Sequence, residues 1–300
     1  MMERIGSYVN GNYIVTMYDN GTKVRSIKDG DEPLPEFPES IDLKITNRCD
    51  NNCPMCHERS TPEGDHGCLN TPFLSTLQPF TEVAIGGGNP LEHPDLLHFL
   101  VRMKNQKVIT NMTVHWKHFE KNRDMLKQMI EDGLIHGIGV SVNKVIPCGI
   151  VDSFADFPNL VVHTIAGMAS EEVYRQLEDR GMNLLILGYK SAGNGRKYFH
   201  LAAEEIVERT AWLRANVFDM RDHFKAIAFD HAALRQMDIR QLVSDDEWKN
   251  LYMGGDGQFT MYVDLVDQKF ATSSTCPIRY DVMPDIRDMF SIIREENEYA

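Results

Sequence analysis

Three of the six cysteines lie within eight residues, at Cys49, Cys53 and Cys56. Cysteine thiolates are strong metal ligands, and three of them in one loop can hold three irons of a [4Fe–4S] cluster. The fourth iron then has no ligand from the protein. Because metals do chemistry at open coordination positions, this spacing predicts a catalytic iron–sulfur site.

A zinc site is the alternative interpretation of the same residues. His57 directly follows Cys56 and could complete a set of four ligands. Zinc sites, however, typically have two pairs of closely spaced ligands that are far apart in the sequence. This chain has one triplet, and Cys68, Cys148 and Cys276 are scattered. The spacing favours a cluster, while a zinc- or cluster-binding structural protein without turnover stays open as the alternative.

The Cys-x3-Cys-x2-Cys pattern, in the loop after the first strand of a repeating βα segment, resembles the radical S-adenosylmethionine (SAM) superfamily. The resemblance covers roughly residues 40–235, with Met55 in place of the family's bulky, often aromatic residue. It implies a [4Fe–4S] cluster that chelates SAM and a one-electron cleavage of SAM to methionine and a 5′-deoxyadenosyl radical. That radical would take hydrogen from a substrate. An external electron donor, such as flavodoxin or ferredoxin, is then expected.

A glycine run follows the second predicted strand, about 30 residues after the triplet. Gly86, Gly87 and Gly88 allow a ligand to approach the backbone, and we expect side chains at Gly87 or Gly88 to intrude on it. The run resembles the family's Gly-Gly-Glu-Pro element, which binds the amino group of SAM. Asn89 occupies the acidic position and would offer a neutral carbonyl in place of a carboxylate. An ordinary turn after a strand is the alternative.

Further polar residues are expected at the carboxyl ends of strands, where parallel barrels place their sites. These are Thr113, Ser141, Asn143, His163 and Lys190. In the resembling family, polar residues after the fourth strand meet the SAM ribose and carboxylate, a role that would suit Ser141 and Asn143. Each could equally well only end a strand, and His163 is more typical of a core histidine with satisfied hydrogen bonds.

Later segments offer weaker candidates. The glycine-containing loop 189–197 carries Lys190 and Arg196 and could bind an anion, although a solvated basic loop is the simpler interpretation. Asp230 follows the last predicted strand and could line the substrate side, as could His231. Cys276 could donate a hydrogen atom or bind substrate, but a lone cysteine is more often a small buried hydrophobic residue.

The elements that position these residues alternate between strand and helix. Strands are predicted near residues 41–46, 83–85, 108–110, 138–142, 160–163, 184–187 and 226–229. Helices are predicted between them, among them 96–105, 119–132 and 201–217. This pattern predicts an α/β fold with parallel strands, a partial (βα)6 TIM-type barrel over residues 40–235. Residues 1–39 predict an antiparallel β-meander and linker, and 236–300 a short C-terminal extension with a hairpin, 260–271, and a helix.

Composition narrows the partners. Of 300 residues, 31 are basic and 44 acidic, for a net charge of −13, and no basic run occurs. Binding to nucleic acid in bulk is therefore disfavoured, and a peptide or small molecule is the expected substrate. No apolar stretch reaches the roughly 20 residues that span a bilayer, and the N-terminus lacks the apolar core of a signal peptide. These features predict a cytoplasmic protein.

Overall fold

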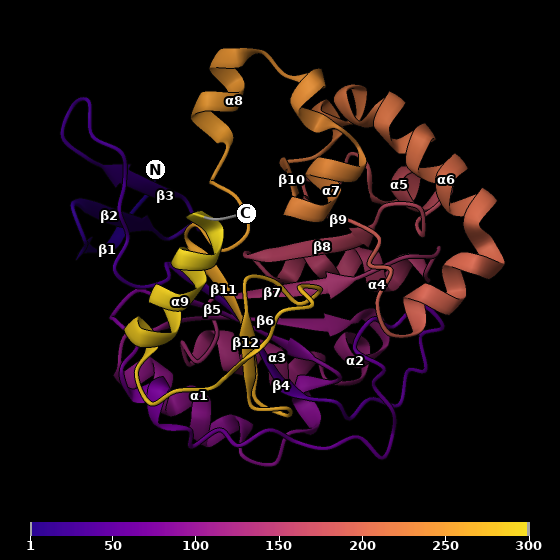
Figure 1. The fold of residues 1–300 in the computed structure, drawn as a ribbon. Helices are drawn as coiled ribbons and strands as arrows, with labels where there is room; N and C mark the ends of the chain where they lie inside the picture. Colours follow the sequence, from indigo (N-terminus) through magenta and orange to yellow (C-terminus); the bar gives the residue numbers. More distant parts are fainter. Residues whose placement is uncertain (1, 299–300) are drawn as a thin grey trace.

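A computed structural model describes residues 2–298 of the chain, which form two sheets (Figure 1). The smaller sheet is antiparallel, in the order β1-β2-β3, and its strands are Arg4–Asn10, Tyr13–Tyr18 and Lys23–Ser26. The Asn-Gly pairs at 10–11 and 20–21 connect these strands, as the sequence predicts. Residues 27–39 contain no helix or strand, in agreement with the predicted linker.

The larger sheet has ten strands in the order β10-β9-β8-β7-β6-β5-β4-β11-β12-β13. Its parallel part comprises β4 (Ser40–Thr46), β5 (Glu82–Gly87), β6 (Ile109–His115), β7 (Gly137–Ser141), β8 (Leu160–Ile165), β9 (Asn183–Leu187) and β10 (Ala226–Phe229). Each of these strands pairs with the next one along the chain. Within residues 2–298, β10 and β13 are edge strands, so the sheet is open.

From β5 onward, each of these strands is followed along the chain by one or two helices. They are α1 (Leu96–Asn105), α2 (Trp116–Lys121), α3 (Arg123–Glu131), α4 (Cys148–Asp152), α5 (Glu171–Leu177), α6 (Asn194–Met220) and α7 (His231–Gln236). The predicted helix 119–132 is in fact two helices that meet at Asn122, whose φ of −121° interrupts the turn. The predicted helix 201–217 is longer at both ends, with a break at Ala202. Figure 1 shows α6 along the outside of the fold.

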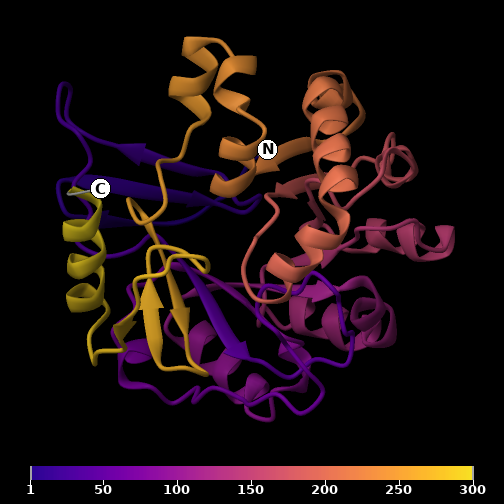
Figure 2. The same cartoon turned by 45° about the vertical axis from the view of Figure 1, so that its right-hand side comes forward.

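The C-terminal strands continue the main sheet. β11 (Thr260–Asp264) pairs in parallel with β4, while β12 (Lys269–Ala271) returns antiparallel and pairs with β13 (Tyr280–Asp281). The expected terminal hairpin therefore exists, but it is joined to the edge formed by β4. Along the chain, helix α8 (Asp245–Leu251) precedes these strands and α9 (Ile286–Glu298) follows them. Figure 2 shows α9 near the N-terminal strands, where Arg294 donates to the Pro35 carbonyl oxygen (2.7 Å).

The main core lies on one side of the large sheet, between its apolar face and the surrounding helices. Ile41, Leu43 and Ile45 of β4 alternate inward and are at most 1% exposed. The period of two in this strand is what one face of a pleated strand requires. No helix within residues 2–298 combines the length and apolar character needed to cross a membrane.

Candidate cluster and SAM site

The cysteine triplet lies in the loop that leaves the carboxyl end of β4. Backbone hydrogen bonds fix this loop at both ends: the Cys49 amide donates to the carbonyl oxygen of Thr61 (2.8 Å), and the Cys56 amide to that of Cys53 (3.1 Å). The carbonyl oxygen of Cys56 also accepts from the amide of Asn194 (3.0 Å), at the start of α6. The loop is thus held by β4 and by a helix that begins about 140 residues later.

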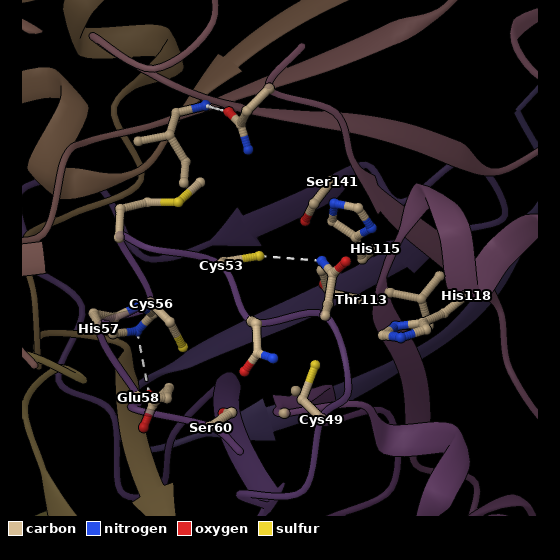
Figure 3. A pocket seen from close by; sticks show the side chains of 18 of the residues that line it. Cys49, Cys53, Cys56, His57, Glu58, Ser60, Thr113, His115, His118 and Ser141 are labelled. Carbon is tan, nitrogen blue, oxygen red and sulfur yellow. Dashed lines mark hydrogen bonds and ion pairs between the residues drawn. The ribbon is translucent and has the colours of Figure 1, made fainter. Parts of the chain in front are cut away.

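A cavity of about 420 Å³ adjoins this loop, which is within the usual range of about 300–1,000 Å³ for small-molecule sites. Figure 3 shows the sulfur atoms of the three cysteines around one space, near Thr113 and Ser141. The predicted residues that line this cavity are Cys49, Cys53, Met55, Cys56, Gly86, Gly87, Gly88, Thr113, Ser141 and Asn143. The structure therefore brings together residues from β4, β5, β6 and β7 that the sequence separates by about 90 positions.

The three thiols are half-buried and interact with one another. Burial, together with the nearby thiols of Cys53 and Cys56, raises the pKa of Cys49 to about 11. Burial likewise raises the pKa of Cys53. Without a bound cation, the thiolate forms of Cys49 and Cys53 are therefore costly. A metal centre would offset that cost by binding the thiolates.

The grouping of metal-ligating atoms bears on the alternative of a single zinc ion. Within residues 2–298, only the ligand atoms of Cys49, Asp50 and His118 form a group of three that lie within 4.8 Å of one another. The three thiols therefore do not all approach that closely. On tetrahedral zinc, with a Zn–S bond of about 2.3 Å, sulfur atoms would stand about 3.8 Å apart. As the side chains stand, the three thiols do not form a compact site for one zinc ion, whereas Cys49, Asp50 and His118 do group closely.

The glycine run ends β5 beside the cysteine loop. The amide of Gly88 donates to the carbonyl oxygen of Thr46 (2.7 Å), and that of Asn89 to the carbonyl oxygen of Arg48 (2.7 Å). A Cβ at Gly87 would lie 2.4 Å from the Thr46 oxygen, and one at Gly88 would lie 2.2 Å from the Arg48 oxygen. A Cβ at Gly86 would meet nothing within 4 Å. Gly87 and Gly88 thus make room for the backbone of the cysteine loop; both also line the cavity, and their contact with a ligand stays a prediction.

Asn89 is buried and does not line the cavity. Its side-chain oxygen accepts from the amide of Leu91 (3.3 Å), and its side-chain nitrogen donates to Glu92 (3.1 Å). These bonds cap the short 3₁₀ helix Pro90–Glu92. The structure thus gives Asn89 a structural role, and its binding of SAM stays a prediction.

Two other predicted polar residues lie at the carboxyl ends of their strands as expected. Thr113 and Ser141 occur near the ends of β6 and β7 and line the cavity. Asn143 lies just beyond β7, and its side-chain oxygen accepts from the amide of Ile165 (2.6 Å). Its amide nitrogen has no hydrogen-bond partner within residues 2–298 and is available to a ligand.

The basic loop after β9 does not line the cavity. The ammonium of Lys190 donates to Ser274 (2.9 Å), and Arg196 is exposed at the start of α6. The glycines of this loop allow close backbone packing: a Cβ at Gly193 would lie 2.2 Å from the carbonyl oxygen of His57. Loop 189–197 therefore supports the cysteine loop, and anion binding by Lys190 and Arg196 stays a prediction.

Asp230 and Cys276 also lie outside the cavity. The carboxylate of Asp230 caps α7, where it accepts from the amides of Gly188 (2.8 Å) and Ala233 (2.7 Å). Cys276 is half-buried in the loop between β12 and β13, with its sulfur 4.0 Å from a carboxylate oxygen of Glu296. Nothing in these contacts assigns either residue to catalysis, and both roles stay predictions.

Several residues that line the cavity are absent from the sequence-based predictions. They come from the end of β6, from α2 and from the loop after β7: His115, Lys117, His118 and Lys144. His118 contacts Asp50 (2.7 Å). Burial, together with the charges of His118, Lys117 and Lys144, lowers the pKa of His115 to about 4. The exposed ammonium groups of Lys117 and Lys144 make this rim positive in an acidic protein.

A buried ion cluster adjoins the loop, and one of its members, Glu58, also lines the cavity. The ammonium of Lys44 lies 2.9 Å from Glu58 and 2.8 Å from Asp264, and all three side chains are at most 11% exposed. Burial acts to lower the pKa of Lys44, but the two carboxylates outweigh it and raise the pKa. Glu58 also accepts from the hydroxyl of Tyr262 (3.1 Å). This cluster joins the cysteine loop to β4 and β11.

Known structures share the fold. Neither a family model nor a curated protein sequence matches this chain. Among solved structures, SuiB of Streptococcus suis bound to S-adenosylmethionine superposes with a TM-score of 0.55 at 11% identity, over 83% of this chain. SuiB bound to the precursor peptide SuiA gives a TM-score of 0.53 at 13% identity, over 86% of this chain. The chain spans 64% and 61% of the length of these two structures.

This likeness establishes a fold similar to that of SuiB. At such low identity it says nothing about which residues act. The mixed α/β architecture, with a mostly parallel main sheet and a separate N-terminal antiparallel sheet, agrees with the predicted fold class.

Proposed function

We propose that this chain is a radical SAM enzyme that holds a [4Fe–4S] cluster through Cys49, Cys53 and Cys56. One observation carries the proposal: the three thiols line the same cavity as Gly86, Thr113 and Ser141, at the carboxyl ends of adjoining parallel strands. The bound cluster and SAM would supply a 5′-deoxyadenosyl radical that abstracts hydrogen from a substrate. In this reading β4 to β9 form a partial (βα)6 barrel, with residues 40–235 as its core.

The chain's own residues would bind and orient SAM. Thr113, Ser141 and the free amide nitrogen of Asn143 can hydrogen-bond its ribose and carboxylate, and the positive rim at Lys117 and Lys144 favours the carboxylate. Ile165 and Met168 supply an apolar wall that would exclude water. Met55 packs against the small core cluster of Met168, Tyr189 and Ile206, which ties the cysteine loop to α6.

A peptide is the favoured substrate, because SuiB shares the fold and was crystallised with a precursor peptide. A small metabolite is the other substrate we consider, and the acidic net charge argues against polynucleotides. A flavodoxin or ferredoxin as electron donor, and a cytoplasmic location, stay predictions. A second candidate is a metal-binding protein without turnover, which the close grouping of Cys49, Asp50 and His118 favours.

Product analysis tests the proposal. Anaerobically reconstituted protein, given SAM and a strong reductant, should slowly release 5′-deoxyadenosine and methionine, even without substrate. Release of S-adenosylhomocysteine as the only product would instead show methyl transfer and contradict the proposed chemistry. If SAM is not consumed under any reductant and the protein holds one zinc ion, the non-catalytic alternative is correct.

A further inference from the structure

A second, polar cavity of about 290 Å³ adjoins the cavity that the three thiols line. His57 and Glu58 line both, so the two cavities meet at these side chains. Figure 3 shows His57 and Glu58 together beside Cys56. The other walls of the second cavity come from the loop after β9, from β11 and from residues 272–279 between β12 and β13. Its volume is close to the lower limit of about 300 Å³ for ligand sites, and it has room for one small group.

The buried carboxylates at this cavity already have partners. Glu58 and Asp264 share the ammonium of Lys44 (2.9 and 2.8 Å), and Glu58 also accepts from the hydroxyl of Tyr262 (3.1 Å). The remaining carboxylate, Asp267, forms no ion pair within residues 2–298 but is exposed to solvent. The acidic side chains of this cavity therefore do not call for a further cation.

Two arginines at the same cavity have no carboxylate partner. Neither Arg59 nor Arg279 forms an ion pair within residues 2–298. The guanidinium of Arg279 is held in place, because it lies 4.9 Å from the centre of the Tyr262 ring and donates to the carbonyl oxygen of Ser274. The guanidinium of Arg59 makes no hydrogen bond in the described part of the chain. The planar fork of an arginine matches a carboxylate in both charge and geometry.

The backbone of Arg59 is strained. Its φ is +53°, in the left-handed region that glycine adopts freely and that a long side chain disfavours. The amide of Arg59 donates to the carbonyl oxygen of Cys56 (3.4 Å), so the cysteine loop imposes this conformation. Strained residues of this kind concentrate at binding sites and active sites. The backbone would favour glycine here, and the arginine is therefore explained by what its side chain can bind.

Hydroxyl groups and an excess of positive charge complete the cavity. Ser274 and Thr275 line it, and the hydroxyl of Ser274 accepts from the ammonium of Lys190 (2.9 Å), which has no ion pair within residues 2–298. The lining side chains include four cations and three carboxylates, namely Lys44, Arg59, Lys269 and Arg279 against Glu58, Asp264 and Asp267. This excess of one positive charge, in a chain of net charge −13, matches a carboxylate better than a doubly charged phosphate.

We propose that this second cavity is a substrate subsite that binds one carboxylate of a peptide through Arg59 and Arg279. The inference rests on the proposed function, because it places the bound peptide next to the SAM cavity, where His57 and Glu58 adjoin both. Arg59 would donate to the carboxylate, and the hydroxyl of Thr275 would add a further donor. The carboxylate can belong to an acidic side chain or to the C-terminus of the peptide, since the chemistry is the same.

Peptide binding tests this subsite, by calorimetry on reconstituted, SAM-loaded protein. The probes are acetyl-Gly-Glu-Gly-amide, the neutral acetyl-Gly-Gln-Gly-amide, and acetyl-Gly-Gln-Gly with a free C-terminal carboxylate. One of the two carboxylate peptides should bind about tenfold more tightly than the neutral peptide, as expected for one charge-assisted hydrogen-bonded pair. Which of the two it is identifies the source of the carboxylate.

Substitutions of Arg59 assign the preference to this cavity. Arg59→Gln should abolish it, whereas Arg59→Lys should keep part of it, because the charge remains and the fork is lost. Arg59→Gly should abolish the preference and raise the urea midpoint, because glycine is unstrained at this φ, so the loss of binding would not be a defect in folding. Arg175→Gln is the control: it removes an exposed arginine that is paired with Glu171 on α5, outside the cavity, and should leave the preference unchanged.

Equal affinity of the three peptides for the wild type, or binding of none of them, would overturn the subsite, as would a preference that survives in Arg59→Gln. Iron content and SAM affinity, measured on the same samples, separate this outcome from failure of the proposed function. Protein that holds the cluster and SAM but ignores the carboxylate refutes the subsite alone. Protein that prefers a carboxylate peptide without holding a cluster or SAM refutes the proposed enzyme and keeps the anion site.

Discussion

Gly86, Gly87 and Gly88 are consecutive but meet different surroundings. Gly87 has a φ of +107°, which strains any other residue, and its Cβ would contact the backbone at Thr46. Gly86 faces open space. We therefore expect Gly87→Ala to lower the free energy of unfolding by about 1–3 kcal/mol, the usual cost of such a backbone conformation. Urea denaturation measures this effect.

Gly86→Ala is the matched control. It should leave the urea midpoint nearly unchanged while narrowing the cavity and weakening SAM binding. Equal stability of the two variants would contradict the packing described here for the end of β5.

Asn89 offers a second comparison at the same strand end. If Asn89 binds SAM, Asn89→Ala should weaken SAM binding by roughly 2–10-fold, the effect of losing one neutral hydrogen bond. If Asn89 only caps the 3₁₀ helix, the same substitution should lower the free energy of unfolding by about 1 kcal/mol and leave the affinity for SAM unchanged. The structure favours the second result. Titration of SAM and urea denaturation of the same variant decide, with Asn89→Asp as the variant that retains the cap.

Residue types and spacing predicted the cysteines and glycines at the centre of this site better than they predicted the residues around them. Cysteines and glycines are informative because few other residues can replace them. Thr113 was found because it is polar after an apolar strand, but the strand was expected to end near 110, and His115 at its true end was missed. The partners of Lys44 were also missed, since Glu58 and Asp264 reach it from a loop and from a strand about 220 residues away.

At the scale of elements, the ion cluster of Lys44, Glu58 and Asp264 connects β4, β11 and the cysteine loop. Lys44→Met would leave the buried carboxylate of Asp264 without its cation and that of Glu58 with only His57 (3.2 Å) beside it. Breaking a buried ion pair in this way costs about 3–5 kcal/mol. We expect a loss of that size in urea denaturation, together with weaker retention of iron, because Glu58 is two residues from Cys56.

Lys269→Met is the control for this prediction. The pair that it removes, Lys269 with Asp281, is largely exposed, and such pairs contribute about 0–1 kcal/mol. Adding Asp264→Asn to Lys44→Met should restore part of the lost stability, because one uncompensated charge is then removed. A Lys44→Met variant as stable as Lys269→Met would show that the cluster does not hold the loop.

The alternation of strands and helices was visible in the sequence because each element has its own apolar period. The position of β11 was not. Residues 260–271 have the pattern of a hairpin, and nothing local indicates that Thr260 to Asp264 would pair in parallel with β4. Pairing between distant strands depends on the packing of the whole chain. The local alternation of apolar residues carries no information about that packing. The boundaries at 39 and 235 likewise stay predictions.

At the scale of the whole molecule, Glu39 joins the two sheets. Its carboxylate accepts from the guanidinium of Arg25 (2.8 Å) and from the hydroxyl of Tyr13 (2.7 Å), and it lies 3.4 Å from the ammonium of Lys23. Burial acts to raise the pKa of Glu39, but the bonds to Arg25 and the charge of Lys23 outweigh it and lower the pKa. Glu39 therefore stabilises the fold at neutral pH.

Because the pKa of Glu39 is lower in the folded state, its contribution is complete above the unfolded value of about 4.3 and is lost as the pH falls below it. Glu39→Gln should thus destabilise the protein at pH 7, by about 3–5 kcal/mol. The difference from wild type should shrink below pH 4. Urea denaturation at several pH values measures it, with Glu32→Gln in the exposed linker as the control. A stability difference between Glu39→Gln and wild type that did not change with pH would contradict the stabilising role of ionised Glu39.

The metal content of the protein tests the central claim most directly. Anaerobically reconstituted wild type should contain about four irons and four sulfides per chain, the composition of one [4Fe–4S] cluster. The Cys49→Ala, Cys53→Ala, Cys56→Ala triple variant should contain none. The Cys68→Ala, Cys148→Ala double variant, which alters two exposed thiols, should match the wild type. Iron and sulfide retained by the triple variant, or one zinc ion in the wild type, would contradict the account.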